Sequence, residues 1–435
     1  MLILYFAVCG FTFGLYRLDQ VITLPTPVGI LNGNDLLLAA LLLFSIPEYL
    51  RQRRGHPSPW FRRVELAWIA LLILLAIASF NSFAANLRDR FVHLRFVEPY
   101  LLFFPTVAVL TDIRRLRLCM AFGVVIAILG TALTLAQSIH GLSLLTDSPM
   151  YDIGSWLGNR GMVGGLVRVN LPISNWVAFV LLLLMAALLL RWRWWVVGLF
   201  SLLALAIFIN FARSLWLSLL AGFLLEIALF FRAGILDGKS ALRIALVPVG
   251  GAIALLLAPL FGLETLGDTI LGRIAEGMEF FSTGSGTWGN RVDQSQWTWK
   301  LLDRGHWLFG VGTDYETFSG FVIDLGLPAT LLSVGIVGLL VFFGALIVCF
   351  LAGIDGLKEG IRRDDLLAVL VCVGLPAVIV QRLVYQHWLY PESAGILAAA
   401  VGAALMVPYL SEESEEGEAL KDHESEEEEE EGSSG

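Results

Sequence analysis

Long apolar runs are the feature that most constrains this chain. Stretches of roughly 20 apolar residues, the length that crosses the hydrocarbon of a bilayer, occur about twelve times between short polar segments. Since 57% of the 435 residues are hydrophobic and only 15% are charged, a soluble globular domain is excluded. We therefore predict an all-α integral membrane protein whose membrane domain covers residues 1–410. The runs fall at about residues 1–16, 28–50, 64–83, 95–111, 116–139, 171–190, 195–211, 214–231, 241–261, 327–351, 365–385 and 393–410.

The basic residues of the connections predict the orientation of these spans. Five connections carry 5, 3, 2, 3 and 3 arginines or lysines, and all five fall on one side if twelve spans alternate. Basic connections favour the cytoplasmic side. We therefore expect a protein of the cytoplasmic (inner) membrane with both termini inside and two loops outside, around 140–170 and over 262–327. The five connections are 51–63, 114–117, 191–193, 232–243 and 358–363.

The two ends of the chain differ from the rest. The first run starts at Met1 without basic residues before it, which favours a retained span over a cleaved signal peptide. The segment 411–435 is rich in glutamate and supplies most of the formal net charge of -9. Such a composition is typical of a disordered, solvated tail. We expect this tail to lie in the cytoplasm.

The segment 262–327 is the longest one without a spanning run, and its middle concentrates aromatic and basic residues. Trp288 and Trp297 stand there with Arg291 and His306. Arginine forks bind phosphate oxygens bidentately, and tryptophan faces stack on sugar rings, so we interpret this segment as an active-site loop. Anchoring of the tryptophans at the membrane surface is an equally strong interpretation.

A helix is predicted in the middle of this loop. Asn290 is a suitable N-cap, and Gly305 is a suitable residue to close the helix after about Asp303. Arg291, Ser295 and Thr298 follow helical spacing, so Arg291 would head a polar stripe at the amino end. Because the peptide dipole is positive at that end, an arginine beside it favours a phosphate site.

Candidate general bases follow this helix. The sequence GVG at 310–312 is expected to form a flexible turn that brings Asp314 and Glu316 toward the same place. Asp314, Glu316 and His306 are the residues we assign as candidate bases for an acceptor hydroxyl. Two carboxylates alone are a poor metal signature, so we expect neither a metal ion nor another cofactor.

Arginines near the outer ends of spans are further candidates. Arg213 stands between two apolar runs, where a charge is costly unless it faces a partner or a water-filled cavity; snorkelling toward lipid headgroups is the alternative. Arg382 either borders the same outer cavity or pairs with Glu392, and both interpretations stand at this point. Arg160 and Arg273 complete the set of candidate phosphate-binding arginines.

Several short motifs between residues 155 and 345 resemble the superfamily of O-antigen ligases and O-antigen polymerases. They are ARSLWL at 212–217, GNR at 289–291, WTWK at 297–300, GVG at 310–312 and DLGLP at 324–328. The resemblance implies a GT-C type membrane glycosyltransferase with a polyprenyl-pyrophosphate saccharide as donor, and neither a nucleotide sugar nor an obligatory metal. Matched by motif, Arg213 and Arg291 correspond to the two arginines that hold the pyrophosphate.

The resemblance also bears on the branch of the superfamily. The ligases carry a histidine shortly before the glycine that opens the next span, and here neither Tyr315 nor Phe318 is a histidine. This departure favours a polymerase over a ligase. The implied partners are the lipid-linked donor, a glycan acceptor, membrane lipids and other polysaccharide assembly proteins, with no nucleic acid. A transporter or flippase of lipid-linked saccharides is the alternative from another class, since arginines in its cavity would hold the same pyrophosphate.

Overall fold

The computed structural model describes residues 1–12, 23–26, 29–56, 59–81, 94–140, 162–163, 166–167, 173–209, 213–236, 287–312, 326–384 and 393–410. This part of the chain is predominantly helical. Seven of its helices are long and apolar enough to cross a membrane, and two further apolar helices are shorter. The prediction of a helical, multi-pass membrane protein is therefore confirmed, while the total of twelve spans stays a prediction.

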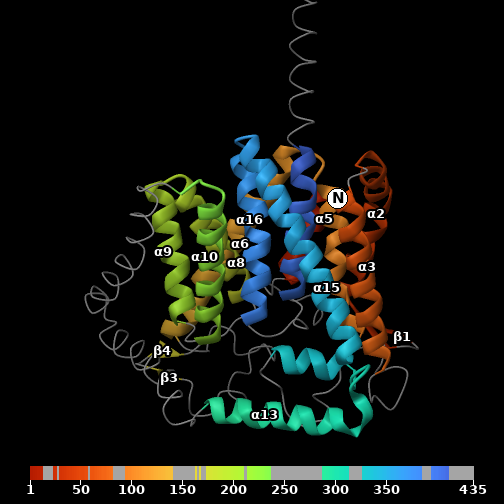
Figure 1. Cartoon of the computed structure of the whole chain (residues 1–435). Helices are drawn as coiled ribbons and strands as arrows, with labels where there is room; N and C mark the ends of the chain where they lie inside the picture. The colour runs from red at the N-terminus through yellow and green to blue at the C-terminus, as the bar shows by residue number, and fades with distance from the viewer. Residues whose placement is uncertain are drawn as a thin grey trace, which may run out of the picture.

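The helices form an upright bundle, and helix α13 lies across one end of it (Figure 1). The seven long helices are α2 (Gly33–Gly55), α3 (Pro59–Phe80), α6 (Ile113–His140), α10 (Arg213–Arg232), α15 (Gly326–Arg362), α16 (Leu366–Val384) and a last helix over Ser393–Leu410. The others are α1 (Leu2–Thr12), α8 (Ser174–Leu190), α9 (Trp194–Ile209), α13 (Thr287–Leu301) and the short π-helical turn η7 (Leu302–His306).

Two short antiparallel hairpins accompany the helices. Strands β1 (Thr23–Thr26) and β2 (Gly29–Asn32) pair with Thr23 opposite Asn32. Strands β3 (Met162–Val163) and β4 (Leu166–Val167) pair with Met162 opposite Val167. Each hairpin is too small to form a core of its own, so the helices determine the fold.

The apolar run at 95–111 does not form the single span that its composition predicts. It contains the 3-10 helices η1 (Leu94–Phe96) and η2 (Glu98–Leu102), followed by the short helix α5 (Phe103–Val109). Pro99 and Pro105 each lack a backbone N–H, which interrupts the hydrogen-bond ladder of a continuous α-helix. The run at 241–261 lies outside the described residues.

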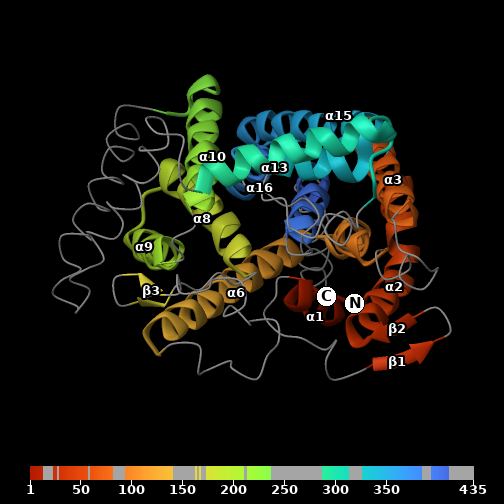
Figure 2. The same cartoon turned by 90° about the horizontal axis from the view of Figure 1, so that it is seen from below.

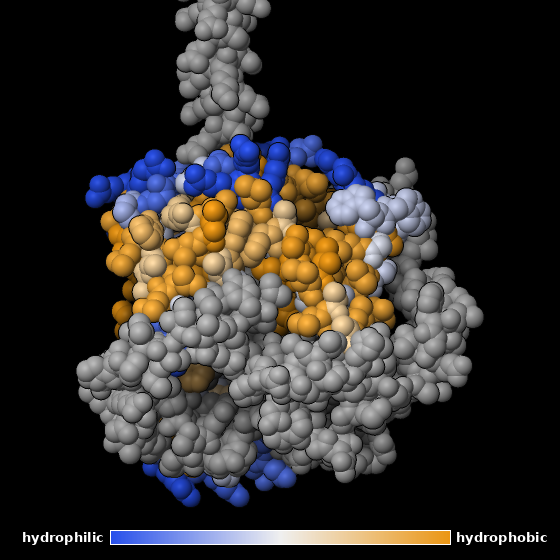
Figure 3. All heavy atoms as spheres, turned by 180° about the vertical axis from the view of Figure 1, so that it is seen from behind, coloured by the Kyte–Doolittle hydropathy of each residue, from blue (hydrophilic) through white to orange (hydrophobic). Residues whose placement is uncertain are grey.

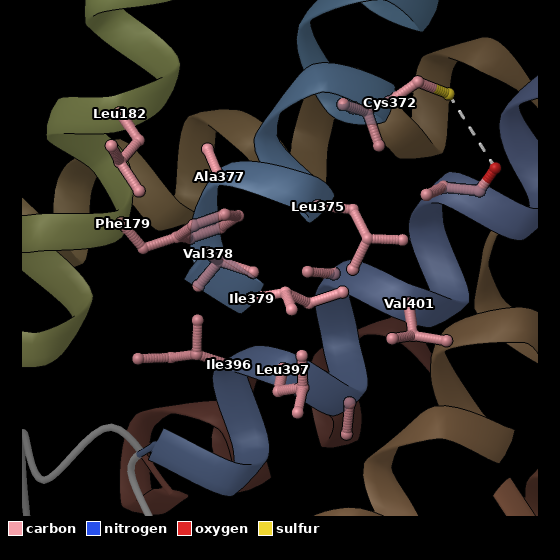
Figure 4. Close-up of a cluster of buried hydrophobic side chains, with 14 of the residues drawn as sticks. Phe179, Leu182, Cys372, Leu375, Ala377, Val378, Ile379, Ile396, Leu397 and Val401 are labelled. Carbon is pink, nitrogen blue, oxygen red and sulfur yellow. Dashed lines mark hydrogen bonds between the residues drawn. The ribbon is translucent and has the colours of Figure 1, made fainter. Parts of the chain in front are cut away.

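Small residues and apolar side chains hold the bundle together. A Cβ atom added at Gly353 of α15 would lie 2.9 Å from the ring of Pro376 on α16, and one at Gly356 would lie 2.7 Å from Sγ of Cys372. These glycines therefore let the two backbones approach closely. Figure 4 shows the neighbouring core, in which Phe179 of α8, Val378 of α16 and Ile396, Leu397 and Val401 of the last helix are all buried.

Hydrophilic residues form a rim at the end of the bundle opposite α13, and an apolar belt follows it (Figure 3). The basic connections that are described lie on this rim, among them the carboxyl end of α2 and the carboxyl end of α15. The amino terminus and the end of the last helix lie toward the same rim (Figure 1). The described basic connections thus lie at one end of the bundle, as the sequence predicts.

Candidate functional site

A buried arginine marks the end of the bundle that faces α13. Arg382 lies near the carboxyl end of α16 and is only 1% exposed. Its Nη1 atom donates to Oδ1 of Asn175 on α8 at 3.2 Å and to Oγ of Ser393, which opens the last helix, at 2.6 Å. A guanidinium keeps its charge when buried, at a considerable cost in desolvation. Helices α16, α8 and the last helix supply Arg382 and these two contacts, and the prediction that Arg382 borders an outer cavity stays a prediction.

The helix α8 brings Asn175 to this arginine because its amino end is fixed against α6. The indole nitrogen of Trp176 donates to the carbonyl oxygen of Gly123 at 2.6 Å. The absence of a side chain at Gly123 makes room for the ring, since a Cβ atom there would lie 2.6 Å from it. Asn175 is 9% exposed as a result. An amide in the first turn of an apolar helix thus serves as a partner of a buried charge.

A second buried polar side chain lies next to Arg382 in the sequence. Gln381 is 0% exposed, and neither its amide nitrogen nor its amide oxygen has a hydrogen-bond partner among the residues that the structure describes. A buried amide without partners is unfavourable by about 1–3 kcal/mol. We name Arg382, Asn175 and Ser393 the Arg382 cluster. It holds a positive charge among buried hydrogen-bonding groups.

Arg213 is the first residue of α10, and its backbone lies at the same end of the bundle. The helix α9 turns back between α8 and α10, so α8 and α10 run in the same direction and α16 runs against both (Figure 1). The helices meet where Gly222 of α10 faces Leu182 and Ala377. Measured along α16 from Ala377, Arg382 lies about 8 Å closer to the α13 side. Measured along α10 from Gly222, Arg213 lies about 14 Å closer to it. The side chain of Arg213 is not among the described ones.

Helix α13 crosses this same end of the bundle, and its amino end lies below α10 in both views (Figures 1 and 2). The helix begins at Thr287, so Asn290 lies inside it and the predicted N-cap is wrong. Arg291 therefore belongs to the second turn. At the other end of the predicted stripe, Thr298 is 2% exposed and therefore faces inward. The structure does not describe the side chain of Arg291 itself.

The structure separates Arg291 from His306. Gly305, at a φ of 104°, closes the helical region and His306 follows it at the end of η7, so the prediction that Gly305 ends the helix is confirmed. The helix alone rises about 15 Å from Arg291 to Leu301. His306 therefore lies at the opposite end of α13 from Arg291, and the two do not belong to one compact site.

The tryptophans of this helix have different surroundings. Trp297 packs against a small buried cluster that includes Leu301 and Leu302, so its ring contributes to packing. Trp299 is 49% exposed, and its ring centroid lies 5.1 Å from that of Trp307. Trp288 lies in the first turn of α13, where only the backbone is described. Trp299 is thus exposed, and its neighbour Trp307 is partly buried against the same small cluster.

The segment after His306 is locked to α15 and is not the flexible turn that GVG suggests. Within α15, Gly335 adopts φ 68° and ψ -172°, which breaks the helix there. The nitrogens of Val311 and Gly312 donate to the carbonyl oxygens of Leu332 and Ser333 at 2.7 and 3.0 Å. Gly310 and Gly312 are buried in this contact.

The exchange of hydrogen bonds at this break is reciprocal. The nitrogens of Ile336 and Val337, which begin the second part of α15, donate to the carbonyl oxygens of Trp307 and Leu308 at 2.8 and 3.1 Å. In an unbroken helix these nitrogens would bond to Leu332 and Ser333. We name this arrangement of Trp307–Gly312 with Leu332–Val337 the α15 interlock. It connects α13 to the membrane bundle through backbone hydrogen bonds, beside a small buried cluster that includes Leu302, Val311 and Leu332.

The remaining predicted site residues cannot be placed. Arg160, Arg273, Asp314 and Glu316 lie outside the described residues. Glu392, the alternative partner of Arg382, lies outside them as well. The partners of Arg382 that sequence reasoning missed are Asn175 and Ser393, and the signal for them is a polar residue in the first turn of an apolar run.

Comparison of the chain with protein-family models and with curated proteins finds no match. The resemblance to the O-antigen ligase and polymerase superfamily therefore depends on the short motifs quoted above. What the described residues establish is a multi-pass helical membrane protein with a buried arginine at one end of the bundle and a polar helix across that end.

Proposed function

We propose that this protein is a glycosyltransferase that transfers a saccharide from polyprenyl pyrophosphate to a sugar hydroxyl of an acceptor glycan, in the manner of an O-antigen polymerase. The observation that carries the proposal is the Arg382 cluster, a buried guanidinium at the bundle end where α10 begins with Arg213. Helix α13, which carries Arg291, lies across that end. Three arginines on separate helices suit a lipid-linked pyrophosphate better than any other ligand class.

The reaction needs help chiefly at its leaving group. A sugar hydroxyl attacks the anomeric carbon, the bond to the pyrophosphate oxygen breaks, and negative charge grows on the departing polyprenyl pyrophosphate. Fixed guanidinium groups in a site of low water content stabilise that charge more in the transition state than in the ground state. We assign this role to Arg213 and Arg291. Asp314 or Glu316 would accept the proton of the hydroxyl, since His306 lies at the other end of α13.

The proposal includes a location. The basic connections gather at the rim opposite α13 (Figures 1 and 3), and such connections favour the cytoplasm. Helix α13 then lies on the outer side of the cytoplasmic membrane, both termini lie inside, and about twelve spans of the GT-C type cross the bilayer. A donor delivered on a lipid suits this location because nucleotide sugars are absent there.

The first experiment tests for chemistry without any second acceptor. The purified protein is incubated in lipid nanodiscs with a polyprenyl-pyrophosphate oligosaccharide alone, and the products are separated on a gel. A ladder of repeat units is the expected result. Transfer that occurs only after a lipid or protein acceptor is added would mean a ligase. If neither mixture yields a product, the transferase proposal fails.

Arginine variants with matched controls test the assigned roles. Arg213→Ala and Arg291→Ala should each lower transfer about 100-fold or more, the size of effect seen when one group that stabilises a transition-state charge is removed. The control for Arg213 is Arg232→Ala at the other end of α10, and the control for Arg291 is Arg304→Ala, an exposed residue of η7. Both controls should keep their activity. Near-normal turnover of an arginine variant would remove that residue from the mechanism.

A transporter or flippase of lipid-linked saccharides is the second candidate, and one observation favours it. Glu226 of α10 is 0% exposed, and neither of its carboxylate oxygens has a hydrogen-bond partner within the described part of the chain. Ionisable groups inside membrane helices often mark ion pathways. Liposomes that contain a fluorescent lipid-linked saccharide would test it: movement of the lipid between leaflets without any product on the gel, and its loss in Glu226→Gln, would favour transport.

A further inference from the structure

The turn that leads into the α15 interlock exposes two large apolar side chains. Leu308 is 59% exposed and Phe309 is 62% exposed, although the backbone of this turn is tightly bonded to α15. Their neighbours in the chain have the opposite character, since Asp303 and Arg304 are exposed and charged. A soluble loop would rarely present a leucine and a phenylalanine side by side to water.

These side chains continue an apolar surface of the bundle. The carbonyl oxygens of Trp307 and Leu308 accept hydrogen bonds from Ile336 and Val337, so the turn lies at the start of the second part of α15. That part has an exposed apolar stripe along its length, and α3 has another beside it. The stripes consist of Ile336, Leu340, Ile347 and Leu351 on α15 and of Ile73, Ile77 and Phe80 on α3.

The length of α15 places this turn relative to the hydrocarbon. The uncharged stretch from Ile336 to Ile354, which ends before Asp355, rises about 28 Å, and the hydrocarbon of a bilayer is about 30 Å thick. If Asp355 marks one edge of the hydrocarbon, Ile336 marks the other. Leu308 and Phe309, which lie beside Ile336 and Val337, then reach that second edge.

The hydrogen bonds of the interlock are compatible with such a location. Backbone groups that face hydrocarbon must be paired within the protein, because lipid offers no partners. At the break in α15, the nitrogens of Ile336 and Val337 and the oxygens of Leu332 and Ser333 are all paired with the Trp307–Gly312 segment. The helix can therefore be broken at the membrane edge without leaving these groups unsatisfied.

We infer that the Trp307–Gly310 turn is inserted into the bilayer edge on the α13 side, with Leu308 and Phe309 in contact with the acyl chains of bilayer lipids. The partly buried Trp307 belongs to this turn and the exposed Trp299 packs beside it, at the interface where tryptophan is favoured. The polar helix α13 is thereby held flat on the membrane surface. This inference is independent of the proposed chemistry and holds equally for a transferase or a transporter.

Spin labels at single cysteines test the inference. In full-length protein whose Cys9, Cys119, Cys349 and Cys372 are replaced by alanine, Leu308→Cys and Phe309→Cys are labelled with a nitroxide and reconstituted into liposomes. The measured quantity is the ratio of collision with oxygen, which enters hydrocarbon, to collision with a polar nickel chelate. The labelled Leu340→Cys serves as the lipid reference and the labelled Arg304→Cys as the water reference.

The ratio of oxygen to nickel-chelate collisions at Leu308 and Phe309 is expected to be several-fold above the ratio at Arg304 and close to the ratio at Leu340. A ratio equal to that at Arg304 would overturn the inference, because the turn would then face water. Shielding from both reagents would overturn it too, because protein would then cover the turn. Phe309→Trp, with the natural cysteines kept, gives a second readout: brominated lipids should quench its added fluorescence, and unchanged quenching relative to wild type would count against insertion.

Discussion

The two ends of α15 are held in different ways. Near its carboxyl end, Gly353 and Gly356 let α16 approach, and the obstacles that a larger residue would meet there include the side chains of Pro376 and Cys372. Near its amino end, the helix is broken at Gly335 and exchanges backbone hydrogen bonds with Trp307–Gly312. The contact near the carboxyl end is thus limited by side chains, and the contact near the amino end adds backbone hydrogen bonds to the buried cluster that holds Val311 and Leu332.

This difference predicts how each end tolerates change. Side chains move by rotation about χ angles, so a tight contact between helices can relax at moderate cost. Backbone groups that are bonded to one another cannot move without losing several hydrogen bonds at once. We therefore expect the interlock to be the more sensitive end of α15. Because the interlock connects α13 to the bundle, a substitution that disrupts it should also displace Arg291 from the proposed site.

The largest effect is expected at Gly335. Its φ of 68° with ψ of -172° lies in a region that is essentially restricted to glycine, and a Cβ atom there would overlap the carbonyl group of Leu308. We expect Gly335→Ala to destabilise the protein by about 3 kcal/mol or more. Thermal unfolding in detergent measures this, and limited proteolysis should show earlier cleavage around α13.

Gly344 of the same helix supplies the matched control. It has no atom within 4 Å of an added Cβ, so Gly344→Ala should be neutral or stabilise by up to about 1 kcal/mol. If both alanine variants unfold at the same temperature as wild type, the interlock does not hold α13. Transfer activity, if present, should fall in Gly335→Ala and stay unchanged in Gly344→Ala.

A smaller and reversible effect is expected at Gly356. A Cβ atom there would lie 2.7 Å from Sγ of Cys372, so we expect Gly356→Ala to cost about 1–3 kcal/mol. Adding Cys372→Ala removes the sulfur and should restore most of the lost stability. No side-chain truncation should rescue Gly335→Ala in the same way, since its obstacle is backbone. A failure of the double variant to recover would mean that the two ends of α15 do not differ as argued.

Sequence reasoning succeeded where a property repeats along the chain. Apolar length predicted the helical membrane fold, and loop charge predicted that the described basic connections share one rim of the bundle. It failed where a feature depends on distant segments. Nothing local in GVG at 310–312 indicates a bond to Leu332, and Gly335 is one glycine among several in an apolar run.

The Arg382 cluster illustrates the same limit at the candidate site. A polar residue near the end of a span singled out Arg382 from the sequence. Its partners Asn175 and Ser393 come from two other helices, and their distance in the chain hides the contact. The predicted span at 95–111 was wrong for a different reason. The hydropathy values of Pro99 and Pro105 do not interrupt an apolar run, although each proline removes a helical hydrogen bond.

The smallest effect is expected for a side-chain contact to a backbone carbonyl of the interlock. The side-chain nitrogen of Asn81, just after α3, lies 3.5 Å from the carbonyl oxygen of Gly310, which is the outer limit for a hydrogen bond. Asn81→Ala should therefore change the unfolding free energy by no more than about 0.5 kcal/mol. A loss comparable to that of Gly335→Ala would show that a side chain, and not the exchange of backbone hydrogen bonds, holds the segment to α15. An unchanged unfolding temperature alongside a destabilised Gly335→Ala would leave the backbone as the cause, because the two positions contact the same turn.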